Sequence, residues 1–166
     1  MKLSRTAFII VLIAFNIAID QISKVIVRAN VTPKSETEII GDYFTLHNVE
    51  NTGAFLGMGS DFNPTLKLVL LLLLPIVVLG YILYYILKNK NLDNYSLIGF
   101  CCVIGGGIAN VYDRVVYKSV TDFFHIDLGG VFRTGIFNVA DMSVMFGMGL
   151  LLYGSFKNTK KEKASN

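Results

Sequence analysis

Charged residues are scarce in this sequence, as are several residue types that build common enzyme sites. Only 16% of the 166 residues are charged, whereas 53% are hydrophobic. A soluble domain of this size rarely carries so few charges, so the composition predicts a membrane protein with a single domain. The net charge of +3 at pH 7 is small and gives no indication of nucleic acid as a partner.

Cysteine and histidine, which supply many metal and nucleophile sites, occur only twice each. Cys101 and Cys102 are neighbours in an apolar segment, and neighbouring residues of a helix do not face each other. Their spacing matches no disulfide framework or zinc site, so we expect both to fill apolar space. His47 and His125 match no ligand spacing, and we expect both to be structural. No serine or cysteine stands beside a plausible histidine base, and the glycines at 105–107 lie in an apolar segment rather than in a nucleotide-binding loop.

Long hydrophobic runs dominate what is present. Four of them, with their flanks, are long enough to cross a bilayer, which predicts transmembrane helices at about 5–27, 66–87, 95–116 and 138–156. The first run also resembles a secretory signal peptide, but no small-x-small cleavage site follows it and its helical periodicity continues through Lys24. We therefore interpret it as a retained span. Glycines in the third and fourth spans predict close contact between helices.

The segments between the spans predict a small extramembrane part on one side. Residues 28–65 are punctuated by glycine and proline and contain two strand-like pieces, at 38–40 and 43–47. This module is too short to fold alone, so we expect it to pack on the helix ends. The segment 117–137 emerges on the same side, whereas the hairpin 88–94 and the tail 157–166 emerge on the other. The expected architecture is a mainly α, four-helix membrane bundle.

The distribution of basic residues predicts the orientation. The side with both termini and the hairpin carries most of the basic residues near the span ends: Lys2, Arg5, Lys88, Lys90, Lys157, Lys160, Lys161 and Lys163. Cytoplasmic loops carry an excess of lysine and arginine, so both termini are expected in the cytoplasm. Four aspartates then fall near the outer face: Asp20, Asp113, Asp122 and Asp141.

Asp122 and Asp141 are the candidate catalytic pair. Asp122 lies in the outer connection, and Asp141 lies in the first turn of the fourth span, where the helix dipole favours a carboxylate. Two neighbouring carboxylates share a proton, so one can act as general base on water while the other polarises a carbonyl. The alternative is a loop acid and a helix-cap charge without catalytic roles. Spacing alone does not exclude Asp127 in place of Asp122.

Other polar residues flank the pair. Asn110, Asp113 and Arg114 share one helical face. Arg114 can bind a backbone carbonyl or a carboxylate, in substrate or within the fold, whereas Asp113 is expected to be structural. Asp20 and Lys24 have the spacing and order of a helical ion pair. The segment 51–55 indicates a turn at the bilayer surface, with or without a role in the site.

Two other function classes fit the paired acids. One is an ion or proton pathway, because paired acids at helix ends serve such pathways too. A pathway also needs polar residues through the depth of the bilayer, and residues 68–83 lack them. The other is a non-enzymatic membrane subunit whose charges dock a partner. It predicts that neither Asp122 nor Asp141 matters more than Asp113 or Asp127.

The sequence resembles the lipoprotein signal peptidases (signal peptidase II), a family of bacterial membrane aspartic proteases. The resemblance covers nearly the whole chain and is carried by five short motifs in order: Asp20-Gln-Ile-Ser-Lys24, Asn51-Thr-Gly53-Ala54-Phe55, Gly105-Gly-Gly-Ile-Ala-Asn110-Val-Tyr-Asp113-Arg114, Val120-Thr-Asp122-Phe123 and Phe137-Asn138-Val-Ala-Asp141. One departure is Ala109, where the family usually has glycine.

The resemblance implies that Asp122 rather than Asp127 pairs with Asp141 in catalysis. It implies a group that lines or supports the site: Asn51, Gly53, Asn110, Arg114, Asn138 and Ala140, with Asp20, Lys24 and Asp113 close by. The implied substrate is a prolipoprotein whose cysteine carries diacylglycerol, cut just before that cysteine. The family needs no metal or cofactor and is blocked by the cyclic peptide globomycin.

The resemblance also implies the setting of the enzyme. It implies an extracytoplasmic β-cradle, and a short extracytoplasmic helix within 117–137. The expected location is the bacterial cytoplasmic (inner) membrane, with lipids around the spans and the active site near the outer face. We expect a monomer, because four spans can enclose the site within one chain.

Overall fold

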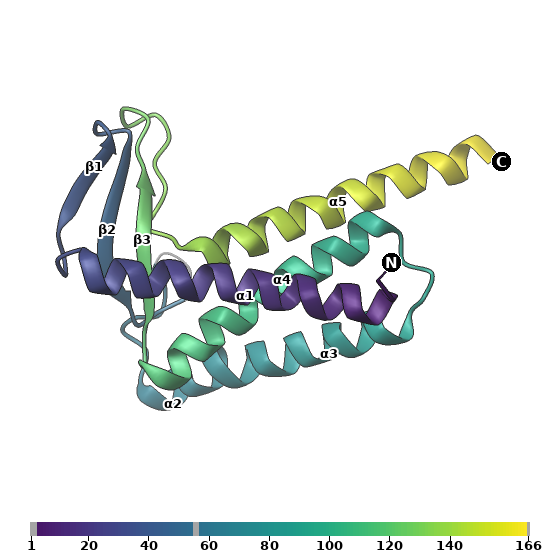
Figure 1. Ribbon diagram of the computed structural model, residues 1–166, viewed down its shortest axis with the longest axis horizontal. Coiled ribbons are helices and arrows are strands. Elements are labelled where there is room, and N and C mark those ends of the chain that lie inside the picture. Colours follow the sequence, from purple (N-terminus) through teal and green to yellow (C-terminus); the bar gives the residue numbers. More distant parts are fainter. Residues whose placement is uncertain (1–2, 55–56, 166) are drawn as a thin grey trace.

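The computed structural model describes the backbone of residues 3–54 and 57–165 and, within those ranges, the side chains up to residue 158. Lys2, Phe55 and the side chains of Lys160, Lys161 and Lys163 lie outside what is described. Within the described residues, four helical segments are long and apolar enough to cross a membrane: Arg5–Asn30, Pro64–Lys88, Asn94–Val116 and Val139–Asn158. They form a bundle with a small sheet at one end, so the expected fold class is confirmed (Figure 1).

Polar side chains cap the start of all four spans, and at the second span Asn63 accepts a hydrogen bond from the Leu66 N–H. Ser4 caps α1 (Arg5–Asn30) by accepting a hydrogen bond from the Ala7 N–H, and Asp93 caps α4 (Asn94–Val116) by accepting from two backbone N–H groups. Asn138 caps α5 (Val139–Ser165) by accepting from the Asp141 N–H. These bonds satisfy donors that have no partner within the helix, and they fix where each span starts.

The second span changes its helical winding. It begins as α2 (Pro64–Lys67), continues as the π-helical segment η2 (Leu68–Leu73) and ends as α3 (Leu74–Lys88). Pro75 lies in the first turn of α3, where it cannot donate a backbone hydrogen bond and where its ring crowds the carbonyl four residues earlier. The wider π turn just before it accommodates this crowding, and Leu74 N–H bonds to Val69 five residues back.

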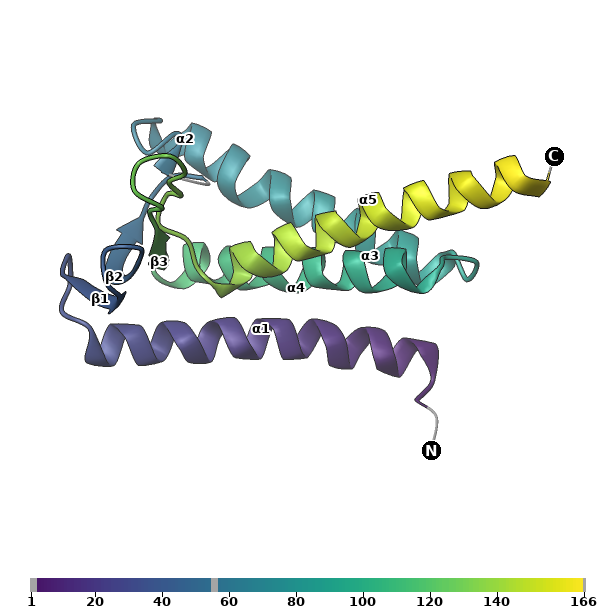
Figure 2. The same ribbon diagram turned by 90° about the horizontal axis from the view of Figure 1, so that it is seen from above.

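Helix α4 lies at the centre of the bundle. It lies between α1 on one side and α3 and α5 on the other (Figure 2). The expected close contact at glycines is present between α4 and α5. A Cβ added at Gly99 would lie 2.7 Å from the Gly147 carbonyl oxygen, and one added at Gly106 would collide with the Ala140 carbonyl oxygen. The second contact brings the start of α5 against the middle of α4.

Apart from α4, the spans bury little of their own surface. The described core contains Ile9, Ile86, Leu97, Cys101 and Ile104, so Cys101 fills apolar space as expected. Large apolar side chains instead face outward along the spans, for example Val77, Ile10 and Phe146. An apolar exterior of this extent is the surface that a bilayer covers.

Three antiparallel strands form the sheet, in the order β1-β2-β3. β1 (Glu36–Ile40) and β2 (Phe44–Asn51) come from the expected module. β3 (Val120–Ile126) comes from the later connection and pairs with β2, so that Val49 stands opposite Asp122. Strand β3 is mostly buried, and it contacts β2 within the sheet and the helices α1 and α4.

The short helix expected within 117–137 is not found, and that expectation is wrong. The segment instead contains β3 and a return, in which Phe137 bridges to β3 and Arg133 bridges to Asp127 just after it. Its sequence, Val-Thr-Asp-Phe-Phe-His-Ile, is rich in the β-branched and aromatic residues that favour strands. The partner strand β2 supplies the hydrogen bonds that a strand of this composition requires.

Candidate active site

Asp122 and Asp141 reach one site from two different elements. Asp122 projects from β3 and is 3% exposed, whereas Asp141 lies in the first turn of α5. Asn138, just before α5, contacts both. Its side-chain Nδ2 donates to Asp122 Oδ1 at 2.6 Å, and its backbone N–H donates to Asp141 Oδ2 at 3.2 Å. One residue therefore sets the position of the two carboxylates relative to each other.

Two further asparagines complete the hydrogen bonds to this pair. Asn51, the last residue of β2, donates to Asp122 Oδ2 at 2.8 Å. Asn110, on α4, donates to Asp141 Oδ1 at 3.0 Å. Each of the four carboxylate oxygens thus accepts one N–H. Carboxylate oxygens have more than one acceptor position each, so capacity remains for water and substrate.

The three asparagine side chains are oriented by their own oxygens. Asn138 Oδ1 accepts from the Asp141 N–H, Asn51 Oδ1 accepts from the Gly53 N–H, and Asn110 Oδ1 accepts from Lys24 Nζ. All three partners are donors only. Because the oxygen of each amide faces a donor, its NH₂ group must face the carboxylate. The amides therefore hold the aspartates in fixed rotamers.

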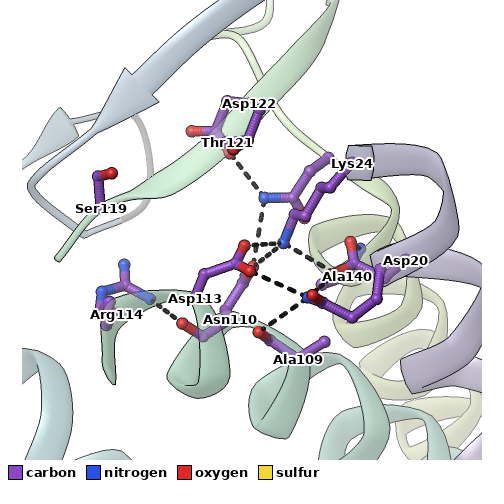
Figure 3. Close-up of polar contacts among 12 residues, drawn as sticks. Asp20, Lys24, Ala109, Asn110, Asp113, Arg114, Ser119, Thr121, Asp122 and Ala140 are labelled. Carbon is purple, nitrogen blue, oxygen red and sulfur yellow. Dashed lines mark hydrogen bonds and ion pairs between the residues drawn. The ribbon is translucent and has the colours of Figure 1, made fainter. Parts of the chain in front are cut away.

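A buried charge cluster contacts the oxygen of the Asn110 amide, whose NH₂ group faces Asp141 (Figure 3). Lys24 Nζ lies 2.8 Å from Asp20 Oδ2, 2.7 Å from Asp113 Oδ2 and 2.8 Å from Asn110 Oδ1, and its side chain is fully buried. The predicted ion pair between Asp20 and Lys24 is confirmed, and both side chains are fully buried. Buried charges are costly unless they are paired and hydrogen-bonded, which accounts for the three partners of Lys24.

Asp20 links this cluster to the start of α5. Its Oδ1 accepts a hydrogen bond of 2.8 Å from the Ala140 N–H, in the turn that carries Asp141. Ala140 is fully buried and packs against Gly106 of α4. Both residues thus fix the position of the first turn of α5, which carries Asp141, relative to α4. Asp20 does so through a hydrogen bond and Ala140 through close packing.

The sequence interpretation overlooked several members of this network. Arg28 Nη2 lies 3.4 Å from Asp113, its Nε donates to Thr121 Oγ1 at 2.7 Å, and its guanidinium lies over the Tyr117 ring. Glu50 accepts from Thr121 and Ser119, which joins β2 to β3 beside Asp122. The four-residue spacing of Asp20, Lys24 and Arg28 is the pattern that could have revealed Arg28. Glu50 gave no comparable pattern.

Arg114 and Gly53 together hold the loop that carries Asn51. Arg114 Nη2 donates to the Gly53 carbonyl oxygen at 2.8 Å, and Nη1 donates to the Asn110 carbonyl oxygen. Both of these contacts of Arg114 are therefore with backbone carbonyl oxygens of the fold. A Cβ at Gly53 would lie 2.6 Å from the Gly57 carbonyl oxygen, so the loop closes only around a glycine.

Burial raises the pKa of Asp122 to about 6. Loss of solvation is the main cause, and the neighbouring Asp141 adds to it, whereas the hydrogen bonds from Asn51 and Asn138 oppose it. A carboxyl group with this pKa holds or releases a proton close to neutral pH, as a general acid or base requires.

Two cavities border the pair. One of about 290 Å³ is lined by Asp122 and Asn51, and the other, of about 340 Å³, by Asp141 and Phe137. Gly135 lines both. An extended chain that crosses Gly135 would therefore pass both carboxylates.

Asp127 and the histidines lie elsewhere. Asp127 Oδ2 lies 3.5 Å from Arg133, and Oδ1 accepts from the Gly130 N–H in the turn beyond β3. The rings of His47 and His125 pack edge to face with centroids 5.7 Å apart, which agrees with the structural role expected for both. None of the described hydrogen bonds joins these three residues to Asp122 or Asp141.

The fold is shared with solved structures of bacterial membrane enzymes. Two superpose on this chain with TM-scores of 0.80 and 0.78, at 23% and 22% sequence identity, and cover 93% and 90% of it and 90% and 93% of their own lengths. The arrangement of four spanning helices with a sheet at one end is thus the fold of those enzymes. Residues 12–157 match the family model described as signal peptidase (SPase) II, and the chain belongs to that family.

Curated relatives are similar in sequence to this chain over most of their lengths. A lipoprotein signal peptidase of Clostridium novyi (strain NT) is 32% identical over 138 residues, which are 83% of this chain and 90% of the relative. One from Borrelia hermsii (strain HS1 / DAH) is 32% identical over 168 residues, 96% of this chain and 98% of the relative. One from Borreliella burgdorferi (strain ZS7) is 36% identical over 154 residues, 90% of this chain and 87% of the relative.

Proposed function

We propose that this protein is an aspartic endopeptidase that removes signal peptides from diacylglyceryl-modified prolipoproteins. Membership of the signal peptidase II family supports the substrate class. The observation that carries the chemistry is the bridge made by Asn138, which holds Asp122 from β3 and Asp141 from α5 in one site. Two carboxylates brought together from distant parts of the chain are the arrangement that a shared-proton mechanism needs.

In the proposed reaction, one aspartate of the pair accepts a proton from water, and the water oxygen attacks the scissile carbonyl. The other aspartate, initially protonated, donates a hydrogen bond to the carbonyl oxygen. The proton roles then reverse as the C–N bond breaks and the amine leaves. The raised pKa of Asp122 supports one shared proton near neutral pH, and the titration belongs to the pair rather than to either residue.

The surrounding residues act as positioning groups in this proposal. Asn51, Asn110 and Asn138 aim the carboxylates, and Arg114 with Gly53 holds the loop of Asn51. Asp20, Lys24 and Asp113 fix Asn110 and the start of α5. Holding the reacting groups within contact supplies proximity and orientation, which lower the barrier without new chemistry.

The location of the pair suits a lipid-anchored substrate. Strand β3 and the start of α5, which carry the two aspartates, lie at the end of the bundle where the helices meet the sheet (Figure 1). Two acyl chains on the cysteine of the substrate would hold it at bilayer depth, since each buried methylene contributes about 0.8 kcal/mol. The bond just before that cysteine would then lie at the level of the pair. Gly135, which borders both cavities, is the proposed crossing point of the peptide.

The proposed setting is the bacterial cytoplasmic membrane, with both termini inside and the site at the outer face. Arg5, Lys88 and Lys90 lie at the ends of spans away from the sheet, as the positive-inside rule requires of the cytoplasmic side. We expect the protein to act as a monomer, and we expect globomycin, a cyclic peptide, to block cleavage by competing for the substrate site.

The test is cleavage of a diacylglyceryl-modified prolipoprotein peptide in detergent, with thermal unfolding measured for every variant. Asp122→Asn and Asp141→Asn should each abolish cleavage while the protein stays folded. Asp127→Asn, which removes a carboxylate from the same connection, should cleave at the wild-type rate. Full activity of either Asp122→Asn or Asp141→Asn would overturn the proposed chemistry. A folded wild type that fails to cleave would overturn the function, and proton flux in liposomes would then be measured.

A further inference from the structure

A further cavity, lined by polar and apolar residues, lies at the end of the bundle away from the sheet. It has a volume of about 750 Å³ and lies between the start of α1 and the connection from α3 to α4. Arg5 and Lys90 line it from opposite segments of the chain, and its apolar lining includes Phe8, Leu92 and Ile98. The labelled N-terminus and that connection occupy this end in Figure 1.

The two cations that line this cavity have donors to spare. Arg5 Nη2 donates to the Asn89 carbonyl oxygen at 2.9 Å, and an arginine has four further N–H donors. Lys90 is exposed and makes no hydrogen bond or ion pair with any described residue. By contrast, the Lys88 and Lys157 ammonium groups lie over tyrosine rings, 5.9 Å and 4.7 Å from the centroids.

None of the described residues that line the cavity is acidic. The nearest acid along the chain, Asp93, is occupied by the start of α4. Its Oδ1 accepts from the Tyr95 and Ser96 N–H groups, and its Oδ2 accepts from Ser96 Oγ and Asn158 Nδ2. An anion that entered the cavity would therefore meet two cations and no free carboxylate among these residues.

The cavity lies where apolar spans begin and end. The first span starts at Arg5, and the second ends at Lys88, two residues before Lys90. The two cations of the cavity, Arg5 and Lys90, therefore lie at the depth of lipid headgroups. We propose that this cavity binds the phosphate headgroup of an anionic membrane phospholipid, with its acyl chains along Phe8 and Ile98. Arginine matches phosphate geometry through paired N–H donors, and lysine adds a point charge. Basic pockets between spans at this depth are suited to anionic headgroups.

The volume and the connectivity both fit this ligand. About 750 Å³ lies within the usual range of small-molecule sites and accommodates a headgroup with the first part of its chains. One lipid would contact the start of α1 and the connection between α3 and α4 together. It would thus add to the hydrogen bond of Arg5 to Asn89, which already joins these two parts of the chain.

The test is lipid retention by the full-length protein in detergent, measured by native mass spectrometry. Phosphatidylglycerol is compared with phosphatidylcholine, and glycerol 3-phosphate serves as the headgroup without chains. The double variant Arg5→Gln/Lys90→Gln removes the two cations of the cavity. The matched control Lys88→Gln/Lys157→Gln removes the same charge at the same end, but from residues that lie over tyrosine rings. Circular dichroism verifies that all variants are folded.

We expect the wild type and the control to retain one phosphatidylglycerol in preference to phosphatidylcholine. The cavity variant should bind phosphatidylglycerol about thirtyfold more weakly, the effect expected for two cations near an anionic surface. Equal losses in both double variants would overturn the site in favour of general attraction to a basic surface. Equally tight binding of glycerol 3-phosphate would overturn a lipid ligand in favour of a soluble phosphate. Neither result depends on the proposed peptidase activity.

Discussion

Lys24 Nζ lies 2.8 Å from Asn110 Oδ1, and this contact decides which way the Asn110 amide faces. Because the lysine can only donate, Asn110 must turn its NH₂ group toward Asp141. Lys24 is itself held by Asp20 and Asp113 on either side. The cluster of Lys24, Asp20 and Asp113 therefore orients the Asp141 carboxylate indirectly, through Asn110.

Asn110→Asp tests this relationship. The substitution keeps an oxygen for Lys24 and replaces the NH₂ that faces Asp141 with a second oxygen. We expect cleavage to fall about 10- to 100-fold, since a hydrogen bond to a charged group contributes about 1.5–3 kcal/mol. Asn30→Asp, at the exposed end of α1, makes the same chemical change away from the site and should be silent. Wild-type activity in Asn110→Asp would show that the amide does not aim Asp141.

The Asn138 side chain has two roles: it caps α5, and it donates a hydrogen bond to Asp122. Substitution by shorter side chains separates these roles. Asn138→Ser keeps an oxygen that can cap α5, but the side chain is too short to donate to Asp122. We expect near-normal thermal unfolding and at least tenfold slower cleavage of the lipopeptide. Asn138→Ala loses the cap as well and should be about 1 kcal/mol less stable than the serine variant. If the serine variant cleaves at the wild-type rate, the hydrogen bond to Asp122 is dispensable.

The raised pKa of Asp122 predicts a pH-dependent stability. The ordinary value is 3.8 and the folded value is about 6, so between these pH values the folded protein holds a proton that the unfolded chain has released. The stabilisation that comes from this proton on Asp122 is therefore fully present below about pH 4 and is lost as the pH rises through about 6. The free energy of unfolding of the wild type, relative to that of Asp122→Asn, should decline across this window. A flat profile against Asp122→Asn would contradict the raised pKa.

The contact between α4 and α5 predicts opposite effects at two glycines. Gly99→Ala places a methyl group 2.7 Å from the Gly147 carbonyl oxygen, so the helices must separate, at a cost of about 1–3 kcal/mol. Gly80→Ala on α3 meets no atom within 4 Å and should leave stability unchanged or raise it by up to about 1 kcal/mol. Thermal unfolding in detergent compares the two. Equal stability of both variants would show that α4 and α5 do not pack this closely.

Much of this architecture could be predicted because it depends on local patterns. Apolar runs of spanning length predict the four helices, and the spacing of Asp20 and Lys24 predicts their ion pair, which the structure contains. The short helix expected within 117–137 was implied by the resemblance alone, and the segment instead contains β3, which pairs with β2 some seventy residues earlier in the chain. Pairing over that distance leaves no periodic pattern in the segment itself.

The connections within the site were harder to foresee for the same reason. The resemblance implied that Asn110 and Asn138 support the site, but not the direction of each amide, which depends on the donors around it. Arg28 and Glu50 join the network through β3, whose position was not anticipated. The cavities beside Asp122 and Asp141 exist only once the return from β3 to α5 is in place.

The pairing of β2 with β3 also sets an order of assembly. β2 leaves the membrane before the second span is made, and its partner strand follows only after α4. Until then β2 has an open edge and Asn51 has no carboxylate to bind. Asp141 arrives later still, with the last span. A nascent chain that is still being inserted therefore holds no complete site, so maturation of the protein is coupled to threading of its final helix.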